Sequence, residues 1–235
     1  MPARSRRTLQ YAPAVIPEKV ESAARSAADG MILDLESTVD ESDKNEARAN
    51  LGPFLRDIDF GGKEVIIRIN GFDSDRWLGD LRAAIDAGVD TIRLPKIEEP
   101  WEVRTAVETA NQLAEAAPEF LIQLESPQGV QNGEAIATTC EELPQVTGIG
   151  VGIGDYTTAL GRESHTPELQ NYLLNVTGAY ASIGNMDPLA YVHKDLDTLR
   201  SAAERAKALG HVGQPVPHAA DTEEFVAVLH EVYGV

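Results

Sequence analysis

The sequence has few of the features that mark disulfide-bonded, zinc-binding or membrane proteins. Of its 235 residues one is a cysteine, Cys140, which excludes an internal disulfide. Without a cluster of Cys and His, a thiolate zinc site is also excluded. No apolar run approaches the roughly 20 residues of a membrane span, and the opening MPARSRRTLQYAP has no apolar signal-peptide core. We therefore expect a cytoplasmic protein.

Basic residues are scarce relative to acidic ones. The chain has 20 Lys and Arg against 38 Asp and Glu, a formal net charge of −18. Such a surface repels nucleic acids and anionic membranes, so we expect neither as a partner. A high-salt cytoplasm, in which ions screen the self-repulsion, is a second explanation of the same charge. Adaptation to high salt is therefore a hypothesis.

Short β-branched runs alternate with longer amphipathic segments along the chain, a pattern typical of βα units around a parallel sheet. The predicted strands are residues 8–13, 30–36, 64–70, 91–96, 121–126, 147–154, 185–192 and 211–217. The predicted helices begin near residue 17 and then cover 43–55, 75–88, 100–116, 129–140, 168–182, 194–210 and 222–234. Eight such pairs predict an α/β fold, a compact (β/α)8 TIM barrel that forms one domain over residues 1–235. A doubly wound sheet would have fewer strands and a Gly-rich first turn, and the first turn here, APAVIPEK, has no glycine.

Polar residues occur where the predicted strands end. In a (β/α)8 barrel the carboxyl ends of the strands meet at one mouth, where catalytic groups from several strands converge. The candidate site residues at these positions, in chain order, are Arg7, Asp34, Glu36, Arg68, Asn70, Lys96, Glu125 and Asp155.

Glu125 and Asp155 are the candidate metal ligands. Two carboxylates at neighbouring strand ends, without nearby His or thiolate, form a hard oxygen site suited to Mg²⁺ or Mn²⁺. Gly152 and Gly154, in GIGVGIGDY, allow backbone amides to approach a ligand and to cradle a carboxylate beside the metal. The alternative is that both acids cap the helices that follow them.

Arg68 and Lys96 each have two interpretations. Arg68 lies in the apolar run VIIRIN, where its guanidinium can grip a substrate carboxylate or polarise a carbonyl, or form an internal salt bridge to Asp34 or Glu36. Lys96 can pair with the same acids or form a Schiff base, although the paired carboxylates favour metal-assisted chemistry. The five histidines show no metal-ligand spacing, which leaves His218, near the eighth strand end, as the one candidate among them.

Together these motifs resemble the citrate lyase β-subunit family, within the HpcH/HpaI aldolase and malyl-CoA/citramalyl-CoA lyase superfamily. The resemblance runs nearly end to end, through RTLQYAP, MILDLES, KNEAR, VIIRIN, IRLPK, ESPQGVQNGEAIA and GIGVGIGDYTTALG. It implies a (β/α)8 barrel that assembles as a homotrimer or homohexamer, Mg²⁺ held by Glu125 and Asp155, and Arg68 on the keto-acid portion of the substrate. It also implies that Arg7 lies near the CoA side.

Three departures from the family pattern separate the possible functions. Ser37 stands where the family has the last acid of its Asp-Leu-Glu-Asp motif, and where related aldolases have a His. QPVPHAA replaces the family's Ile-His-Pro segment, and we expect no C-terminal lid domain beyond the eighth pair. The general base is therefore unassigned.

The first hypothesis is a Mg²⁺-dependent carbon–carbon lyase acting on a small hydroxy-dicarboxyl CoA thioester, with Arg68, Asp34 and Glu36 as catalytic groups. Arg7, Lys96 and the two glycines would bind its keto-acid and CoA parts. The alternatives are a metal-dependent aldolase that uses free pyruvate or oxaloacetate, and a non-catalytic binder of keto acid or CoA.

Overall fold

The apolar runs of the sequence form one parallel sheet. The computed structural model describes residues 5–161, 165–217 and 221–234, and within them eight strands alternate with ten helices. The strands are β1 (Thr8–Pro13), β2 (Gly30–Asp34), β3 (Glu64–Arg68), β4 (Thr91–Leu94), β5 (Glu119–Leu124), β6 (Val146–Val151), β7 (Asp187–Leu189) and β8 (Gln214–Val216). The helices are α1 (Pro17–Arg25), α2 (Lys44–Asp57), α3 (Trp77–Asp86), α4 (Pro100–Leu113), α5 (Pro127–Gln131), α6 (Gly133–Glu141), α7 (Ile153–Ala159), α8 (Pro167–Gly184), α9 (Leu196–Ala208) and α10 (Thr222–Tyr233).

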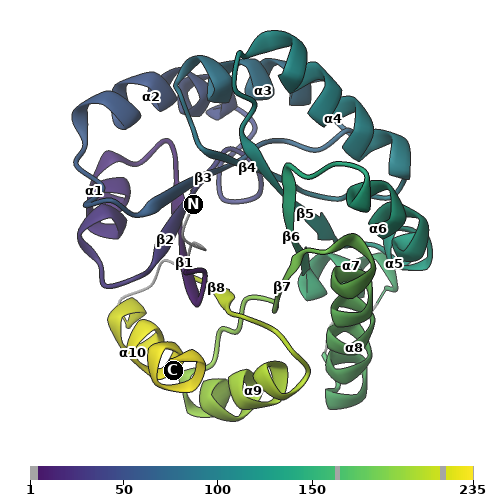
Figure 1. The fold of residues 1–235 in the computed structure, drawn as a ribbon. Coiled ribbons are helices and arrows are strands. Elements are labelled where there is room, and N and C mark those ends of the chain that lie inside the picture. The colour runs from purple at the N-terminus through teal and green to yellow at the C-terminus, as the bar shows by residue number, and fades with distance from the viewer. Residues whose placement is uncertain (1–4, 162–164, 218–220, 235) are drawn as a thin grey trace.

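The sheet curls into a nearly closed barrel with the helices outside it (Figure 1). The strand order is β7-β6-β5-β4-β3-β2-β1-β8, and a single bridge between Leu189 and Gly213 joins β7 to β8. Both strands at this seam are short, and both contain a proline, Pro188 or Pro215, which has no N–H to donate to a neighbouring strand. The predicted (β/α)8 barrel is confirmed, with its weakest pairing where the sequence pattern is weakest.

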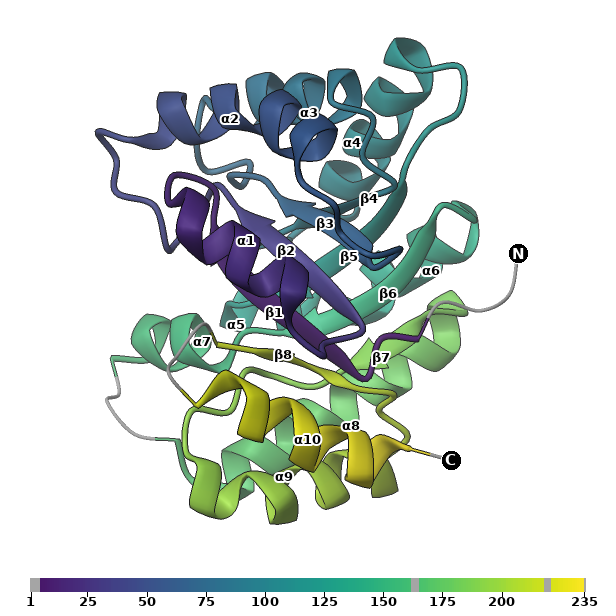
Figure 2. The same ribbon diagram turned by 90° about the vertical axis from the view of Figure 1, so that its left-hand side faces the viewer.

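The core has two layers, inside and outside the strands. Six apolar side chains form a cluster within the barrel, Leu9, Tyr11, Ile32, Ile66, Leu121 and Leu189. Alternate residues on the same strands face outward and pack against the helices, as period-two alternation requires. Figure 2 shows the start of β1 at one end of the barrel and α7 at the other, which is the end where β6 finishes.

The segment after β6 differs from the prediction. The expected strand ran to residue 154, but β6 ends at Val151 and α7 begins at Ile153. The alternating Gly-x-Gly pattern is compatible with strand, and only the packing of Gly152 against Glu125 shows where the chain turns. The predicted helix at 129–140 is likewise two helices, α5 and α6, with the break at Asn132.

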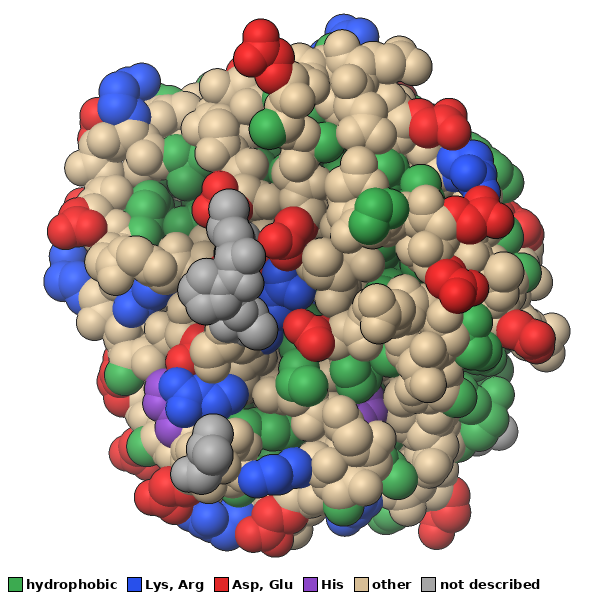
Figure 3. Space-filling model, in the orientation of Figure 1, with side chains coloured by type: hydrophobic (Ala, Val, Ile, Leu, Met, Phe, Trp, Pro, Cys, Tyr) green, Lys and Arg blue, Asp and Glu red, His purple; other side chains and the backbone are tan. Residues whose placement is uncertain are grey.

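Acidic side chains spread over the surface, as the composition requires. On the face shown in Figure 3, Asp and Glu lie around the rim with Lys and Arg between them. Among the described residues, no helix is both long and apolar enough to cross a membrane.

Candidate active site at the barrel mouth

Two cavities open at the carboxyl ends of the strands and share a wall. The larger, of about 630 Å³, is lined by side chains that include Tyr11, Arg68, Arg93, Gln123 and His193. The smaller, of about 360 Å³, lies toward β4 and is lined by residues that include Phe72, Lys96 and Trp101. Glu125 and Asp155 line both cavities. The carboxylate pair predicted from the sequence therefore lies where the two cavities meet.

Glu125 is buried, with one oxygen left without a partner. It follows β5, and 3% of the residue is exposed. Gln123 Nε2 donates to its Oε1, while Oε2 accepts no hydrogen bond from the residues that the structure describes. Burial raises the pKa of this carboxyl to about 7. The positive charges of Arg68 and Arg93 act to lower this pKa, and the negative charge of Asp155 acts to raise it. A desolvated carboxylate with a free oxygen on a cavity wall is the arrangement that a cation would stabilise.

Gly152 makes this position of Glu125 possible. A methyl group at residue 152 would lie 2.4 Å from Glu125 Oε1 and 2.6 Å from its Cγ, far inside normal contact distance. Gly154, by contrast, is exposed, and apart from its own helix no described residue has an atom within 4 Å of where its Cβ would be. Both predicted glycines line the larger cavity, and of the two Gly152 is the one in close contact with Glu125.

The capping alternative does not account for Glu125. The side chain that caps α5 is Ser126, whose Oγ accepts from Gly129 N at 3.1 Å. Asp155 lies in the first turn of α7, where a carboxylate favours the helix dipole, but it is also exposed to both cavities. Helix capping explains part of the position of Asp155 and none of that of Glu125.

The donor set fits a magnesium ion. Within residues 5–161, 165–217 and 221–234 there is no group of three or more His, Cys, Asp or Glu arranged around a metal. Mg²⁺ needs no such cage, since it commonly binds through one or two carboxylates and keeps water or substrate oxygens on its other positions. Glu125 Oε2 and the Asp155 carboxylate supply that number of ligands.

Arg68 is held in place by an internal salt bridge. Its Nε and Nη2 each donate to Asp34 at 2.6 Å, Nη2 donates to Ser37 Oγ at 2.5 Å, and Nη1 lies 3.4 Å from Glu36. The guanidinium also lies 4.6 Å from the centre of the Tyr11 ring. Arg68 lines the larger cavity all the same, so the internal salt bridge orients the group that faces a ligand.

Asp34 lies behind Arg68 and is not among the residues that line either cavity, so the structure favours a positioning role over the expected catalytic one. The residue is fully buried, and its oxygens also accept from Glu36 N, Thr38 N and Thr38 Oγ1. Burial would raise the pKa of Asp34, but the charge and hydrogen bonds of Arg68 outweigh burial and lower it. Asp34 therefore stays ionised and acts by positioning Arg68.

Glu36 and Lys96 form a second ion pair, 2.9 Å between Oε1 and Nζ. Lys96 has a φ of 51°, which is uncommon for a residue other than glycine. This backbone conformation costs about 1–3 kcal/mol. Burial opposes the charge on Lys96, yet Glu36 and then Asp73 raise its pKa. A lysine held in its charged form is a poor Schiff-base nucleophile, so Lys96 acts as a cation on the wall of the smaller cavity.

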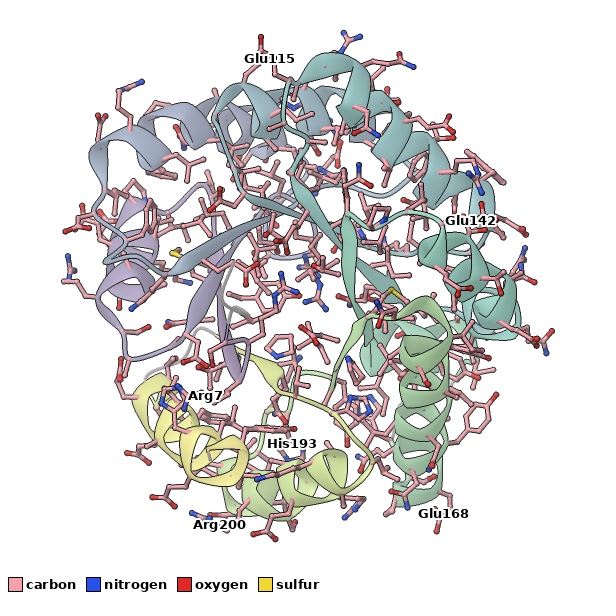
Figure 4. The ribbon with its side chains drawn as sticks, viewed as in Figure 1. Arg7, Glu115, Glu142, Glu168, His193 and Arg200 are labelled. Atoms are coloured by element: carbon pink, nitrogen blue, oxygen red, sulfur yellow. The ribbon has the colours of Figure 1, made fainter. Side chains whose placement is uncertain are left out.

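Arg7 does not lie at the mouth, contrary to the prediction. It precedes β1, donates to Asp29 Oδ1 at 2.6 Å and Oδ2 at 2.9 Å, and lies beside α10 in Figure 4. Asp29 itself precedes β2, so the pair is at the amino-terminal end of the barrel, where strands start. His218 lies outside the described residues.

Three functional candidates were missed in the sequence. Arg93 and Gln123 are buried on β4 and β5, face the larger cavity and hydrogen-bond to each other, with Arg93 Nε donating to Gln123 Oε1 at 2.5 Å. The signal was available, since Arg93 interrupts the apolar run TIRLPK as Arg68 interrupts VIIRIN. His193, labelled in Figure 4, also lines this cavity and follows β7.

Comparison with known proteins agrees with the fold. The model of the HpcH/HpaI aldolase/citrate lyase family matches residues 7–219. Citrate lyase subunit beta of Leuconostoc mesenteroides subsp. cremoris is 33% identical over 164 residues, 66% of this chain and 52% of that protein. The chain thus matches about half the length of that relative. The (3S)-malyl-CoA thioesterase of Cereibacter sphaeroides is 28% identical over 223 residues, 92% of this chain and 74% of the relative.

Among solved structures, protein CitE of Mycobacterium tuberculosis in complex with magnesium, acetoacetate and coenzyme A has a TM-score of 0.79. It is 24% identical, and the match covers 97% of this chain and 80% of that one. At this identity the likeness supports the barrel fold. The family match covers most of the chain and includes every strand-end motif of the mouth. This chain belongs to the HpcH/HpaI aldolase/citrate lyase family.

Proposed function

We propose that this protein is a magnesium-dependent carbon–carbon lyase. Its substrate would be a small 3-hydroxy-dicarboxyl CoA thioester, such as malyl-, methylmalyl-, citramalyl- or citryl-CoA, cleaved or formed by retro-Claisen or aldol chemistry. Mn²⁺ could replace Mg²⁺, because both are hard cations that bind carboxylate and water oxygens. The family and the citrate lyase relative support carbon–carbon lyase chemistry, and the malyl-CoA thioesterase relative supports a CoA thioester as the substrate.

One arrangement carries the proposal, the carboxylate pair of Glu125 and Asp155 with the oriented guanidinium of Arg68 in the same cavity. A divalent cation bound there would stabilise an oxygen on which negative charge develops. Arg68 would donate to a carboxylate or carbonyl of the keto-acid half, in an orientation that Asp34 sets before the ligand arrives.

The reaction breaks the bond between C2 and C3 of the 3-hydroxyacyl thioester. The C3 hydroxyl loses its proton and becomes the carbonyl of the keto acid, while the electron pair of the bond passes to C2, next to the thioester carbonyl. C2 then takes a proton to give the shorter acyl-CoA. The low-dielectric mouth strengthens each of these electrostatic contacts, since Arg68 and Glu125 are both at most 5% exposed.

Two other functions remain as alternatives, an aldolase that uses free pyruvate or oxaloacetate and a non-catalytic binder. The position of Ser37 favours the binder: its hydroxyl accepts from Arg68, where an acid or a His would offer a base. The thioesterase relative adds a further outcome to test, hydrolysis of the thioester in place of carbon–carbon cleavage.

The test is incubation of the protein in high KCl with Mg²⁺ and each of the four CoA thioesters, followed by mass spectrometry. A lyase releases a keto acid and a shorter acyl-CoA, whereas a thioesterase releases free CoA and the intact hydroxy acid. Turnover of free keto acids with aldehydes and without CoA indicates the aldolase. Tight keto-acid binding without any turnover indicates the binder.

Glu125→Gln and Asp155→Asn should each abolish metal binding and cleavage while the fold is kept. Glu142→Gln is the matched control, because Glu142 is an exposed carboxylate paired with Arg104 on the surface. Full activity in either site variant would contradict the metal assignment.

The assembly and location expected from the sequence stay predictions. Light scattering after size-exclusion chromatography checks the homotrimer or homohexamer, and fractionation of the source cells checks the cytoplasm.

A further inference from the structure

A second guanidinium faces the larger cavity, and the chemistry proposed above does not use it. Arg93 lies in the middle of β4, 2% of the residue is exposed, and it lines the cavity. In the register of the sheet Arg93 is directly opposite Arg68 on β3. Two buried cations on adjacent strands therefore face the same space.

The hydrogen bonds of Arg93 are incomplete. Nε donates to Gln123 Oε1, but Nη1 is buried and makes no hydrogen bond with any residue that the structure describes. Nη2 lies over the bare backbone of β6, 3.1 Å from where a Cβ of Gly150 would be. The glycine leaves room for the guanidinium to extend across the barrel.

Arg93 also lacks the ion pair that other arginines buried in the barrel have. Arg68 contacts Asp34 and Glu36. Arg6, at the opposite end, contacts Glu64 and Glu119. In the described part of the chain, no such pair with a carboxylate forms at Arg93. A desolvated cation without a counter-charge is costly unless a ligand supplies one.

The ion pairs of Arg68 and Lys96 do not include Arg93. Asp34 balances Arg68, and Glu36 balances Lys96. A divalent cation on Glu125 and Asp155, as in the proposed function on which this step rests, would be neutralised by them. Arg93 is then left to pair with the ligand.

We propose that Arg93 determines specificity by binding a second carboxylate of the keto-acid half of the substrate. Arg68 and the metal site would bind the 2-oxo acid group. Arg93 Nη1 would donate a hydrogen bond to the distal carboxylate, deeper in the barrel. The preferred keto acid would then be a dicarboxylate, and among candidate thioesters those that release one would be favoured over those that release a monocarboxylate.

The test compares oxaloacetate with pyruvate, which has no distal carboxylate, by calorimetric titration in the presence of Mn²⁺. For the unmodified protein we expect tighter binding of oxaloacetate. Arg93→Met should weaken oxaloacetate binding about tenfold to a hundredfold, the effect of losing a charge-assisted hydrogen bond, with pyruvate affinity unchanged within about twofold. Arg93→Lys should restore part of the preference, because it keeps the charge. Arg104→Met, which removes an exposed surface arginine, is the control.

Equal weakening of both ligands, or no weakening of either, would overturn the proposal. A loss of Mn²⁺ affinity in Arg93→Met would also overturn it, because Arg93 would then act through Gln123 on Glu125. If Arg93→Met does not fold, Arg93→Lys alone tests the proposal. Lysine keeps the charge but lacks the forked guanidinium, so the ratio of oxaloacetate affinity to pyruvate affinity should fall. Failure of the proposed function is read separately, from Mn²⁺ titration and thioester cleavage by the unmodified protein.

Discussion

Gly152→Ala tests whether the position of Glu125 depends on one missing methyl group. The backbone accepts alanine, because Gly152 has a φ of −103°. The obstacle is Glu125, whose Oε1, Cγ and Cδ would lie 2.4, 2.6 and 2.8 Å from the new Cβ. Carbon atoms in contact are normally about 3.5 Å apart, so the side chain would have to move by about 1 Å. Rotation of its tip alone cannot relieve the contact at Cγ.

The expected loss has two parts. Overpacking of this kind destabilises by about 1–3 kcal/mol, and a chain of this size loses about 2–4 °C in Tm for each kcal/mol. Metal binding should weaken about tenfold or more, because Mg²⁺ requires near-ideal geometry at about 2.1 Å, and activity should fall about a hundredfold. The displaced carboxylate would also lose its hydrogen bond from Gln123.

The matched control is Gly154→Ala, two residues further along the same turn. Outside α7 itself, no atom of the residues that the structure describes lies within 4 Å of a Cβ at 154, and alanine is a better helix former than glycine inside α7. This variant should keep its metal affinity and be slightly more stable. Mn²⁺ affinity by electron paramagnetic resonance and Tm by calorimetry would be measured for both variants. Equal metal affinity in Gly152→Ala and Gly154→Ala, with both folded, would refute the assignment of Glu125 as a ligand.

The remaining predictions concern charge. Because burial raises the pKa of Glu125 from 4.5 to about 7, Mn²⁺ affinity should fall about tenfold per pH unit below pH 7 and level off above it; a pH-independent affinity from pH 5.5 to 8 would contradict this. The same shift means that, without metal, the folded state binds the proton more tightly than the unfolded state, so this carboxyl reduces stability as pH rises from 4.5 to 7. Arg68→Lys should lower kcat/KM about tenfold to a hundredfold, since a lysine cannot make both bonds to Asp34 and also face the ligand; unchanged kinetics would assign Arg68 a structural role. If the net charge of −18 reflects adaptation to salt, Tm should rise between 0.1 and 2 M KCl, because the screening length shortens and the surface carboxylates repel one another less. A salt-independent Tm with full activity in dilute buffer would contradict that hypothesis.

The barrel and part of its mouth could be read from the sequence because they depend on local pattern. Apolar runs of period two, amphipathic segments and the prolines near helix starts identify the strands and helices within a few residues. Glu125 was found because it ends an apolar run just before Ser126 and Pro127, which begin a helix. A residue at that junction must lie at the strand's carboxyl end.

The interpretation of Arg68 could not be decided in the same way. Whether it pairs with Asp34 or faces a ligand depends on the register of β2 against β3, which places the two residues opposite each other although they are 34 positions apart. Arg7 was misplaced for a related reason. It adjoins a strand, but the residue lies before β1 and so at the far end of the barrel from the site.

The sequence by itself determined the number and order of the strands and placed Glu125 directly after β5 and Asp155 after β6, because apolar runs and the polar residues that end them are local features. Only the tertiary structure decided that Asp34 supports Arg68 and that Gly152, not Gly154, is in close contact with Glu125. It also decided that Arg93 lines the cavity with one nitrogen that has no hydrogen-bond partner among the described residues. These outcomes depend on which strands are adjacent and on which residues of each strand face the barrel interior. Contacts between residues far apart in the chain determine both.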